Sequence, residues 1–214
     1  MKNKVLLKMK DEQDYIQDIA EMRSMMERSS RFLSLSGLSG IMAGLYALAG
    51  AFIAYEFLHF RTDETAYTAG ESTSVQWQHL IYLALLIFIL AVGTAMFLSY
   101  KNANKRHERL WNATARRLVI NMAVPLVAGG LLILIMISKG FIGLVAPFTL
   151  LFYGLALYNA SKYTYEEMRS LGIIEIVLGL LSAYFVTYGL LFWAVGFGVV
   201  HIIYGIYMHY RYEK

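Results

Sequence analysis

Two ionisable side chains, Glu175 and His201, interrupt apolar stretches near the C-terminal end of the sequence and are the residues best placed for chemistry. Glu175 lies within LGIIEIVLGLL (171–181), and His201 directly follows AVGFGVV. A short turn around Tyr188 separates the two predicted helices and is 13 positions from each residue (188 − 175 and 201 − 188). Because a helix rises about 1.5 Å per residue, equal offsets in an antiparallel pair place both groups at one depth.

Glu175 also lies on the small and polar side of its predicted helix, and His201 lies on a stripe with Trp193, Phe197, Tyr204 and Gly205. The face of Glu175 continues through Gly179 and Ser182, and Tyr204 follows His201 by three residues. Faces of this kind turn toward protein rather than lipid. An ionised carboxylate near mid-membrane costs at least about 2.5–3.5 kcal/mol, which a histidine at the same level offsets. We therefore predict that Glu175 and His201 meet.

Two interpretations of the pair remain open at this stage. In the first it forms a protonatable site with Ser182 and Tyr204, and Asn121 contributes to a polar vestibule that opens toward the cytoplasm. In the second it is an interhelical hydrogen bond that fixes the register of the last two helices, a contact worth on average about 0.6 kcal/mol.

Enzyme chemistry is not expected. The chain has no cysteine, which excludes thiolate catalysis and cysteine-ligated metals. His201 is the single histidine deep in an apolar segment, whereas membrane haem requires two at one level. No zinc spacing and no set of nucleophile, base and orienting group is found. The sequence thus predicts no catalytic residue, no metal and no cofactor.

The elements that must position the pair are membrane helices. Hydrophobic residues make up 58% of the 214 and charged residues 16%, against about 45–50% and 25% in soluble domains. Windows near the length of about 20 residues that crosses a bilayer recur six times. They cover 33–57, 79–99, 118–138, 141–159, 171–187 and 190–209. We expect an all-α integral membrane bundle of six transmembrane helices, arranged as three antiparallel hairpins.

The positions of the charges predict the orientation. Of the 19 Lys and Arg residues, only Arg61 and Lys139 fall in the three connections assigned to the outer side. Cytoplasmic flanks retain Lys and Arg, so both termini are expected in the cytoplasm and the protein in a bacterial inner membrane. The basic residues flank membrane helices and show no nucleic-acid-binding motif, so no nucleic acid partner is expected.

Residues 1–31 form a predicted cytoplasmic amphipathic helix, followed by a six-span domain over 32–214. The apolar stripe of the amphipathic helix has helical spacing and consists of Tyr15, Ile19, Met22, Met26 and Leu33. Besides the lipid bilayer, the expected partners are a second copy of the chain or another protein, docked through residues 11–31. The alternative is a helix that lies on the lipid headgroups or under its own bundle.

Small residues at helical spacing predict close backbone approach. Ser36, Gly40 and Gly44 repeat every fourth residue in the first window, and the last window contains Gly198 and Gly205. Such ridges let membrane helices pack tightly. The pattern fits packing within one bundle and packing between protomers equally well.

The last predicted hairpin, LGIIEIVLGLLSAYFVTYGLLFWAVGFGVVHIIYGIYMHYR (171–211), resembles the repeating hairpin of a family of small six-span bacterial membrane proteins associated with acid resistance. The resemblance rests on glycine and apolar spacing, and the turn here reads VTYG in place of the Trp-Pro found in that family. It implies a stress-related accessory protein without catalytic residues.

The expected function is therefore a non-enzymatic accessory or regulatory role that uses the N-terminal helix for docking. The alternative is a small oligomeric channel or a proton-linked transporter that uses Glu175 and His201.

Overall fold

The computed structural model describes Ile19, Met22 and residues 35–58, 74–105 and 111–213. Every regular element in these residues is a helix, which confirms the all-α prediction. The elements are α2 (Gly37–Glu56), α4 (Ser74–Lys105), α5 (Ala113–Ser138), η1 (Ile142–Leu144), α6 (Val145–Ala160), α7 (Glu167–Tyr184), η2 (Val186–Tyr188), α8 (Gly189–Trp193), η3 (Ala194–Val200) and α9 (His201–Tyr212). The predicted N-terminal helix lies outside the described residues, apart from Ile19 and Met22, which are helical and exposed.

Five segments are long and apolar enough to cross a membrane, which indicates a membrane protein. They are Gly37–Glu56, Gln78–Lys105, Ala113–Ser138, Ile142–Ala160 and Val186–Tyr212. These segments overlap five of the six predicted windows. The remaining window, 171–187, falls mostly in α7, whose 18 residues include three charged ones, Glu167, Arg169 and Glu175. Its charge, rather than its helical structure, distinguishes α7 from the other five.

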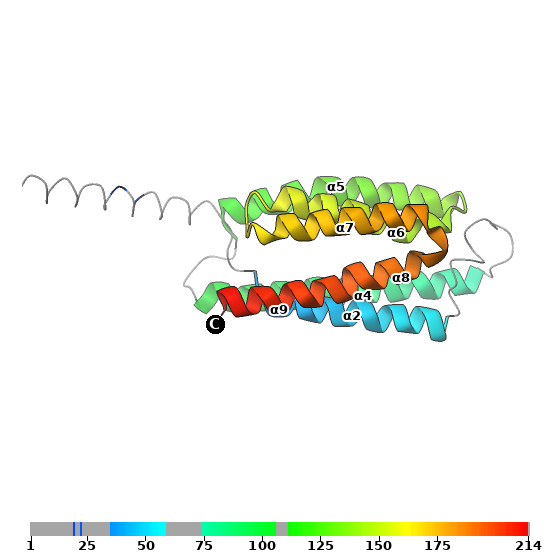
Figure 1. Ribbon diagram of the computed structural model, residues 1–214, viewed down its shortest axis with the longest axis horizontal. Coiled ribbons are helices and arrows are strands. Elements are labelled where there is room, and N and C mark those ends of the chain that lie inside the picture. The colour runs from blue at the N-terminus through cyan, green and yellow to red at the C-terminus, as the bar shows by residue number, and fades with distance from the viewer. Residues whose placement is uncertain (1–18, 20–21, 23–34, 59–73, 106–110, 214) are drawn as a thin grey trace, which may run out of the picture.

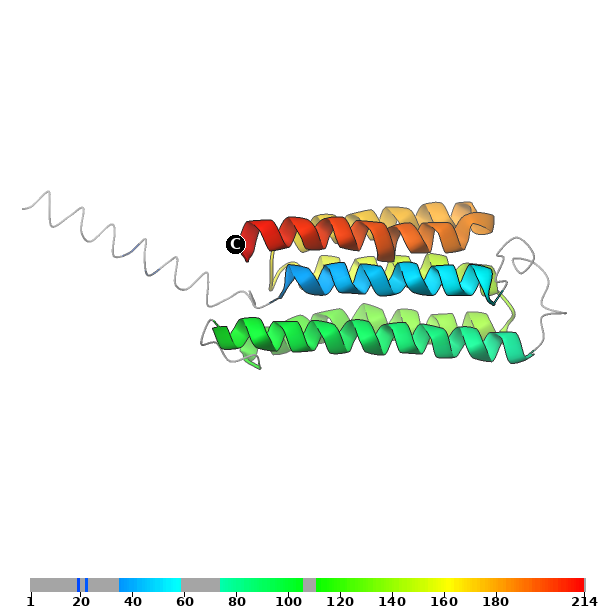
Figure 2. The ribbon, with the colours of Figure 1, turned by 90° about the horizontal axis from the view of Figure 1, so that it is seen from below.

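The helices form two layers of three (Figures 1 and 2). In one layer α2 lies between α4 and the helix formed by α8, η3 and α9; in the other α6 lies between α5 and α7. The chain passes from the second layer to the first through η2 and α8 (Figure 1). We call the end of the bundle at which α2 begins and α9 ends the basic end.

α5 packs on α6 and α2 on α4, as the predicted hairpins require, but two other extensive contacts cross the boundaries of the predicted hairpins. α7 packs along α6, and α9 packs along α2, while α7 meets the last helix mainly at α8 and η3. The last two helices therefore belong to different layers. Contact between the layers depends on the few side chains that reach across, and Glu175 and His201 are among them.

Glycines bring α2 and α9 into backbone contact. A Cβ atom added to Gly37 would lie 2.5 Å from the Gly205 carbonyl oxygen, and one added to Gly44 would lie 2.6 Å from the Gly198 carbonyl oxygen. Both distances are too short for a side chain. The small residues of the first and last windows therefore pack helices within one bundle, which answers the question that the sequence left open.

Glycines also join α6 and α7. A Cβ atom on Gly154 would lie 2.6 Å from the Gly172 carbonyl oxygen, and one on Gly172 would lie 2.7 Å from that of Gly154. This reciprocal contact fixes how far apart the two helices lie. It also fixes the rotation of α7 that turns Glu175, three residues after Gly172, into the bundle.

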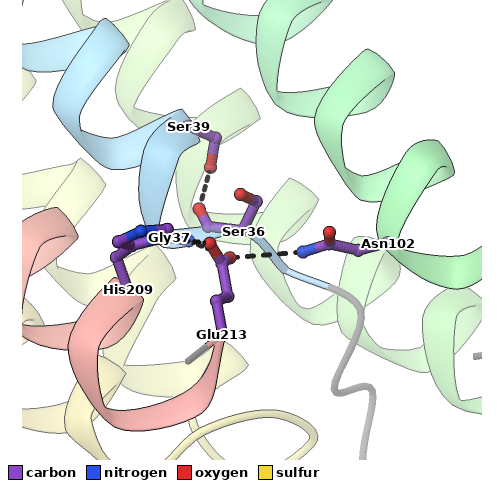
Figure 3. A network of polar contacts seen from close by, with 6 residues as sticks. All are labelled: Ser36, Gly37, Ser39, Asn102, His209 and Glu213. Atoms are coloured by element: carbon purple, nitrogen blue, oxygen red, sulfur yellow. Dashed lines mark hydrogen bonds and ion pairs between the residues drawn. The ribbon is translucent and has the colours of Figure 1, made fainter. Parts of the chain in front are cut away.

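A carboxylate near the C-terminus joins three helices at the basic end (Figure 3). Glu213 Oε1 accepts hydrogen bonds from the Gly37 backbone N–H at 2.7 Å and from Asn102 Nδ2 at 3.2 Å. Glu213 Oε2 pairs with His209 Nδ1 at 2.5 Å. Because Ser36 gives α2 no side-chain cap, Glu213 serves as the acceptor for the first turn of that helix.

These contacts change the titration of Glu213. Burial alone would raise the pKa of its carboxyl, but hydrogen bonds from His209, Ser36, Gly37 and Asn102 outweigh burial and lower the pKa from 4.5. A carboxyl whose pKa is lowered by folding stabilises the folded state above the unfolded pKa. That contribution is lost as the pH falls through the folded pKa.

We predict that Gly154→Ala destabilises the protein by about 1–3 kcal/mol, because the added methyl group forces α6 and α7 apart. Gly130→Ala is the matched control, since a Cβ atom there meets nothing within 4 Å. Thermal unfolding in detergent measures both variants. Equal melting temperatures for the two variants would contradict close packing of α6 on α7.

We predict that Glu213→Gln lowers the melting temperature at neutral pH, because a neutral amide is a weaker acceptor for Gly37 and His209. The difference from the unmodified protein should shrink as the pH falls below 4.5 and the native carboxyl also becomes neutral. Melting curves recorded across this pH range provide the measurement. A difference that stays constant with pH would show that the charge of Glu213 is not involved.

Candidate functional site

The structure brings Glu175 and His201 together. The distance from His201 Nδ1 to Glu175 Oε1 is 3.4 Å. Glu175 is 0% exposed and His201 is 5% exposed, so both are turned into protein. The predicted contact is confirmed, and the two residues come from different layers of the bundle.

Local backbone features make room for the pair. His201 is the first residue of α9 and directly follows the π-helical segment η3. A Cβ atom on Gly196 in that segment would lie 2.6 Å from Glu175 Oε2 and 2.6 Å from Leu150 Cδ2. The Glu175 carboxyl therefore lies against bare backbone. Single π-helical turns are rare and occur frequently at functional sites.

The partners of the imidazole define its tautomer. Nδ1 lies 2.9 Å from the Gly196 carbonyl oxygen, and Nε2 lies 3.0 Å from the Tyr153 hydroxyl oxygen. A carbonyl oxygen only accepts, so Nδ1 must carry a hydrogen. In the neutral ring Nε2 then accepts a hydrogen bond from Tyr153. The rings of Tyr153 and Phe197 flank the imidazole, with centroids 5.5 and 5.8 Å from its own.

The Glu175 carboxyl lacks the donors that an ionised group needs. Among the described residues neither of its oxygens has a hydrogen-bond partner, because the Nδ1 hydrogen of His201 is directed to Gly196. An unpaired buried carboxylate is costly. An ionised Glu175 carboxylate would therefore be buried without a hydrogen-bond donor among the described residues.

The structure also shows the surroundings of the three other residues predicted for the site. Ser182 is completely buried on α7 but is seven residues beyond Glu175. Tyr204 follows His201 by three residues, and its hydroxyl is buried with no partner in the described part of the chain. Asn121 does not belong to the pair: its amide donates to the Arg117 carbonyl at 2.8 Å, within α5. In this layer α6 lies between α5 and α7, and the vestibule to which Asn121 would contribute stays a prediction.

The sequence analysis missed Tyr153. This residue lies in α6, 48 positions before His201, and its hydroxyl is the hydrogen-bond partner of His201 Nε2. A tyrosine hydroxyl within an apolar segment is the feature of the sequence that could have indicated a polar contact at this position. Nothing in the spacing along the chain shows that α6 meets α9 at this level.

The arrangement can store and move a proton. With one proton held on the pair, Glu175 and His201 together are neutral. A second proton gives a positive imidazolium, whose Nε2–H donates to the Tyr153 oxygen. Loss of the last proton leaves a carboxylate in an apolar interior. In the described residues no group of three or more His, Cys, Asp or Glu side chains could hold a metal ion.

Comparison with known proteins adds no family. No protein-family model, curated protein or solved structure matches the chain. The resemblance of residues 171–211 to the acid-resistance family stays a prediction.

We predict that ¹⁵N NMR of the unmodified protein shows neutral His201 as the Nδ1–H tautomer, with Nε2 accepting a hydrogen bond. Tyr153→Phe removes the donor to Nε2 and should shift its resonance, while Tyr46→Phe, which affects a contact between α2 and α4, should not. An Nε2–H tautomer in the unmodified protein would contradict the hydrogen bond from Nδ1 to Gly196.

Proposed function

We propose that this chain is a six-span bacterial inner-membrane protein that binds a proton at Glu175 and His201 and acts as a small proton-linked transporter or channel. The observation that carries the proposal is the buried Glu175 carboxyl, which lies 3.4 Å from a histidine nitrogen and has no hydrogen-bond partner among the described residues. Intramembrane ionisable groups commonly mark proton or ion pathways.

The length of α7 supports its assignment as the sixth span. Its 18 residues extend about 27 Å, close to the hydrocarbon thickness of about 30 Å. Glu167 and Arg169 lie in its first turn, at the basic end, where they can reach the headgroups. Glu175 is neutral when it carries the proton. An even number of spans puts both termini on the same side of the membrane. The Lys and Arg residues at the basic end favour the cytoplasm as that side.

The geometry favours a proton site over a contact that only fixes helix register. A register contact gains stability when the donor points at the acceptor, whereas here His201 donates to the Gly196 backbone. The Glu175 oxygens then lose their hydration without replacement, at a cost of about 1–3 kcal/mol for each unpaired group. An ionised group costs more than this, and proton uptake by the carboxyl removes the additional cost of the charge.

Protonation at this position can drive a conformational change. Glu175 and Tyr153 belong to the layer of α5, α6 and α7, whereas His201 belongs to the layer of α2, α4 and α9. Deprotonation leaves a charge at the junction of the two layers, which favours any arrangement that admits water or a cation. Since binding shifts a conformational equilibrium through differential affinity, the proton load sets the balance between such arrangements.

A second candidate function rests on the N-terminal stripe. Ile19 and Met22 are 64% and 60% exposed, so these two apolar side chains are not packed on the bundle. Their exposure supports the use of the apolar stripe predicted for residues 11–31 in docking a protein partner or a second copy. An accessory, stress-related role would use this surface and would not need Glu175 to titrate.

A flux assay separates the two functions. In proteoliposomes with an internal pH indicator, Glu175→Gln should abolish pH-driven proton flux, because the amide keeps the shape of the carboxyl but cannot take up a proton. Removal of residues 1–31 should leave the flux intact. Glu56→Gln, an exposed carboxyl at the far end of α2, is the control. Flux that survives Glu175→Gln would overturn the proposal and leave the docking function.

A further inference from the structure

Buried polar atoms without partners are concentrated on two helices. Among the described side chains these atoms are Glu167 Oε2, both carboxyl oxygens of Glu175, Ser182 Oγ and the Tyr204 hydroxyl oxygen. All of them belong to α7 or α9. Buried polar groups normally have a protein or water partner, so this clustering requires an explanation.

Tyr204 lies on α9 between His201 and the basic end. It is one helical turn beyond His201, and its hydroxyl is within electrostatic range of Glu167 and Tyr153. Tyr165 and Tyr212 also contribute to the potential at Tyr204. A hydroxyl that both donates and accepts, placed between two proton-carrying groups, is suited to relay protons.

Glu167 lies where the route would reach water. Its Oε1 accepts a hydrogen bond from the Tyr212 hydroxyl at 2.7 Å and lies 3.0 Å from Arg211 Nη1. The Arg211 side chain is 54% exposed, while Oε2 of Glu167 is buried and has no partner among the described residues. One oxygen is thus tied to a solvent-facing cation and the other is directed into protein.

We propose that internal water between α7 and α9, hydrogen-bonded to Tyr204 and Glu167, carries protons from the basic end to Glu175 and His201. Internal water typically makes about three hydrogen bonds to polar groups that lack other partners, and the unpaired atoms of Glu167, Tyr204 and Glu175 supply such groups. This inference rests on the proposed function and adds the side from which the proton arrives.

The transfer balances at each group. The Glu167 carboxylate takes up a proton from bulk water and releases it to the file. Tyr204 accepts a proton at its oxygen as its own hydroxyl proton moves on. The last water of the file then gives a proton to the Glu175 carboxylate, whose oxygens have no hydrogen-bond partner among the described residues.

His201 keeps its hydrogen on Nδ1, directed to the Gly196 carbonyl oxygen, throughout the transfer. Nδ1 lies 3.4 Å from Glu175 Oε1, and the ring remains neutral while Tyr153 continues to donate to Nε2. The groups that face this route are Tyr153 from α6, Glu167 and Glu175 from α7, Tyr204, Arg211 and Tyr212 from α9, and Tyr165 from the connection between α6 and α7.

Tyr204→Phe is the most direct test, because it removes a hydroxyl that has no protein hydrogen bond to lose. Hydrogen–deuterium exchange of the Glu175 carboxyl is followed by infrared spectroscopy on the full chain in proteoliposomes, with Glu175→Gln identifying the band. Exchange should slow by about tenfold, equivalent to about 1.4 kcal/mol on the barrier. The melting temperature should not fall. The control is Tyr46→Phe, because the Tyr46 hydroxyl contacts Thr94 between α2 and α4, away from the route. In this variant the Glu175 carboxyl should exchange at the native rate.

Glu167→Gln provides a second variant and should also slow exchange, because it removes the entry carboxylate. Native exchange rates in both Tyr204→Phe and Glu167→Gln would overturn the route. The proposed function would still stand if Glu175→Gln abolished flux. Conversely, loss of fast exchange in Tyr204→Phe combined with normal flux in Glu175→Gln would support the route and reject the transport function.

Discussion

A carboxyl group cannot remain in an apolar helical bundle without either a proton or a polar partner, and this constraint accounts for much of the arrangement around α7. Glu175 must face protein, so α7 is rotated with its glycines and Ser182 inward. Gly196 must lack a side chain, because any Cβ atom there would overlap the carboxyl. Tyr153 must reach His201 from α6 to complete the ring's hydrogen bonds. Four elements are thus positioned by the needs of one acidic group.

Close backbone packing supplies the rigidity that such a site requires. In a membrane there is no hydrophobic effect to bring helices together, so glycines at the α2–α9 and α6–α7 contacts allow dispersion forces to act over long surfaces. Each contact stabilises one layer. The layers are then joined by Glu175 and His201 in the interior and by Glu167 with Arg211 at the basic end. A bundle with stiff layers and a polar junction is able to change shape at the junction.

The sequence predicts the pair because helical rise and periodicity are local properties. Equal offsets of Glu175 and His201 from Tyr188, and the inward face through Gly179, require no knowledge of neighbouring helices. The partners of the pair depend on the register between α6 and α9, which packing decides, so Tyr153 could not be found in this way.

The same distinction between local helical pattern and packing between helices explains where other predictions differ from the structure. Apolar windows predicted the positions of the helices, but the pairing of α2 with α9 and of α6 with α7 follows from backbone approach at glycines far apart in the chain. Asn121 is predicted to contribute to a polar vestibule, whereas its amide is hydrogen-bonded to the Arg117 carbonyl within α5, a contact that depends on the local rotamer. Glu213 was not singled out, since capping of α2 by a residue 176 positions away has no local signal.

The pair lies at the junction of the two layers, which supports the proposal that its charge is functional rather than structural. Had Glu175 met a histidine on α6, its protonation would have changed the stability of one layer and left the other unaffected. Because His201 belongs to the opposite layer, each proton gained or lost changes the energy with which the two layers hold together. A charge that costs several kilocalories per mole at such a junction is large compared with the weak forces between membrane helices. The same proton that makes the Glu175 carboxyl tolerable can therefore determine which arrangement of the layers is stable.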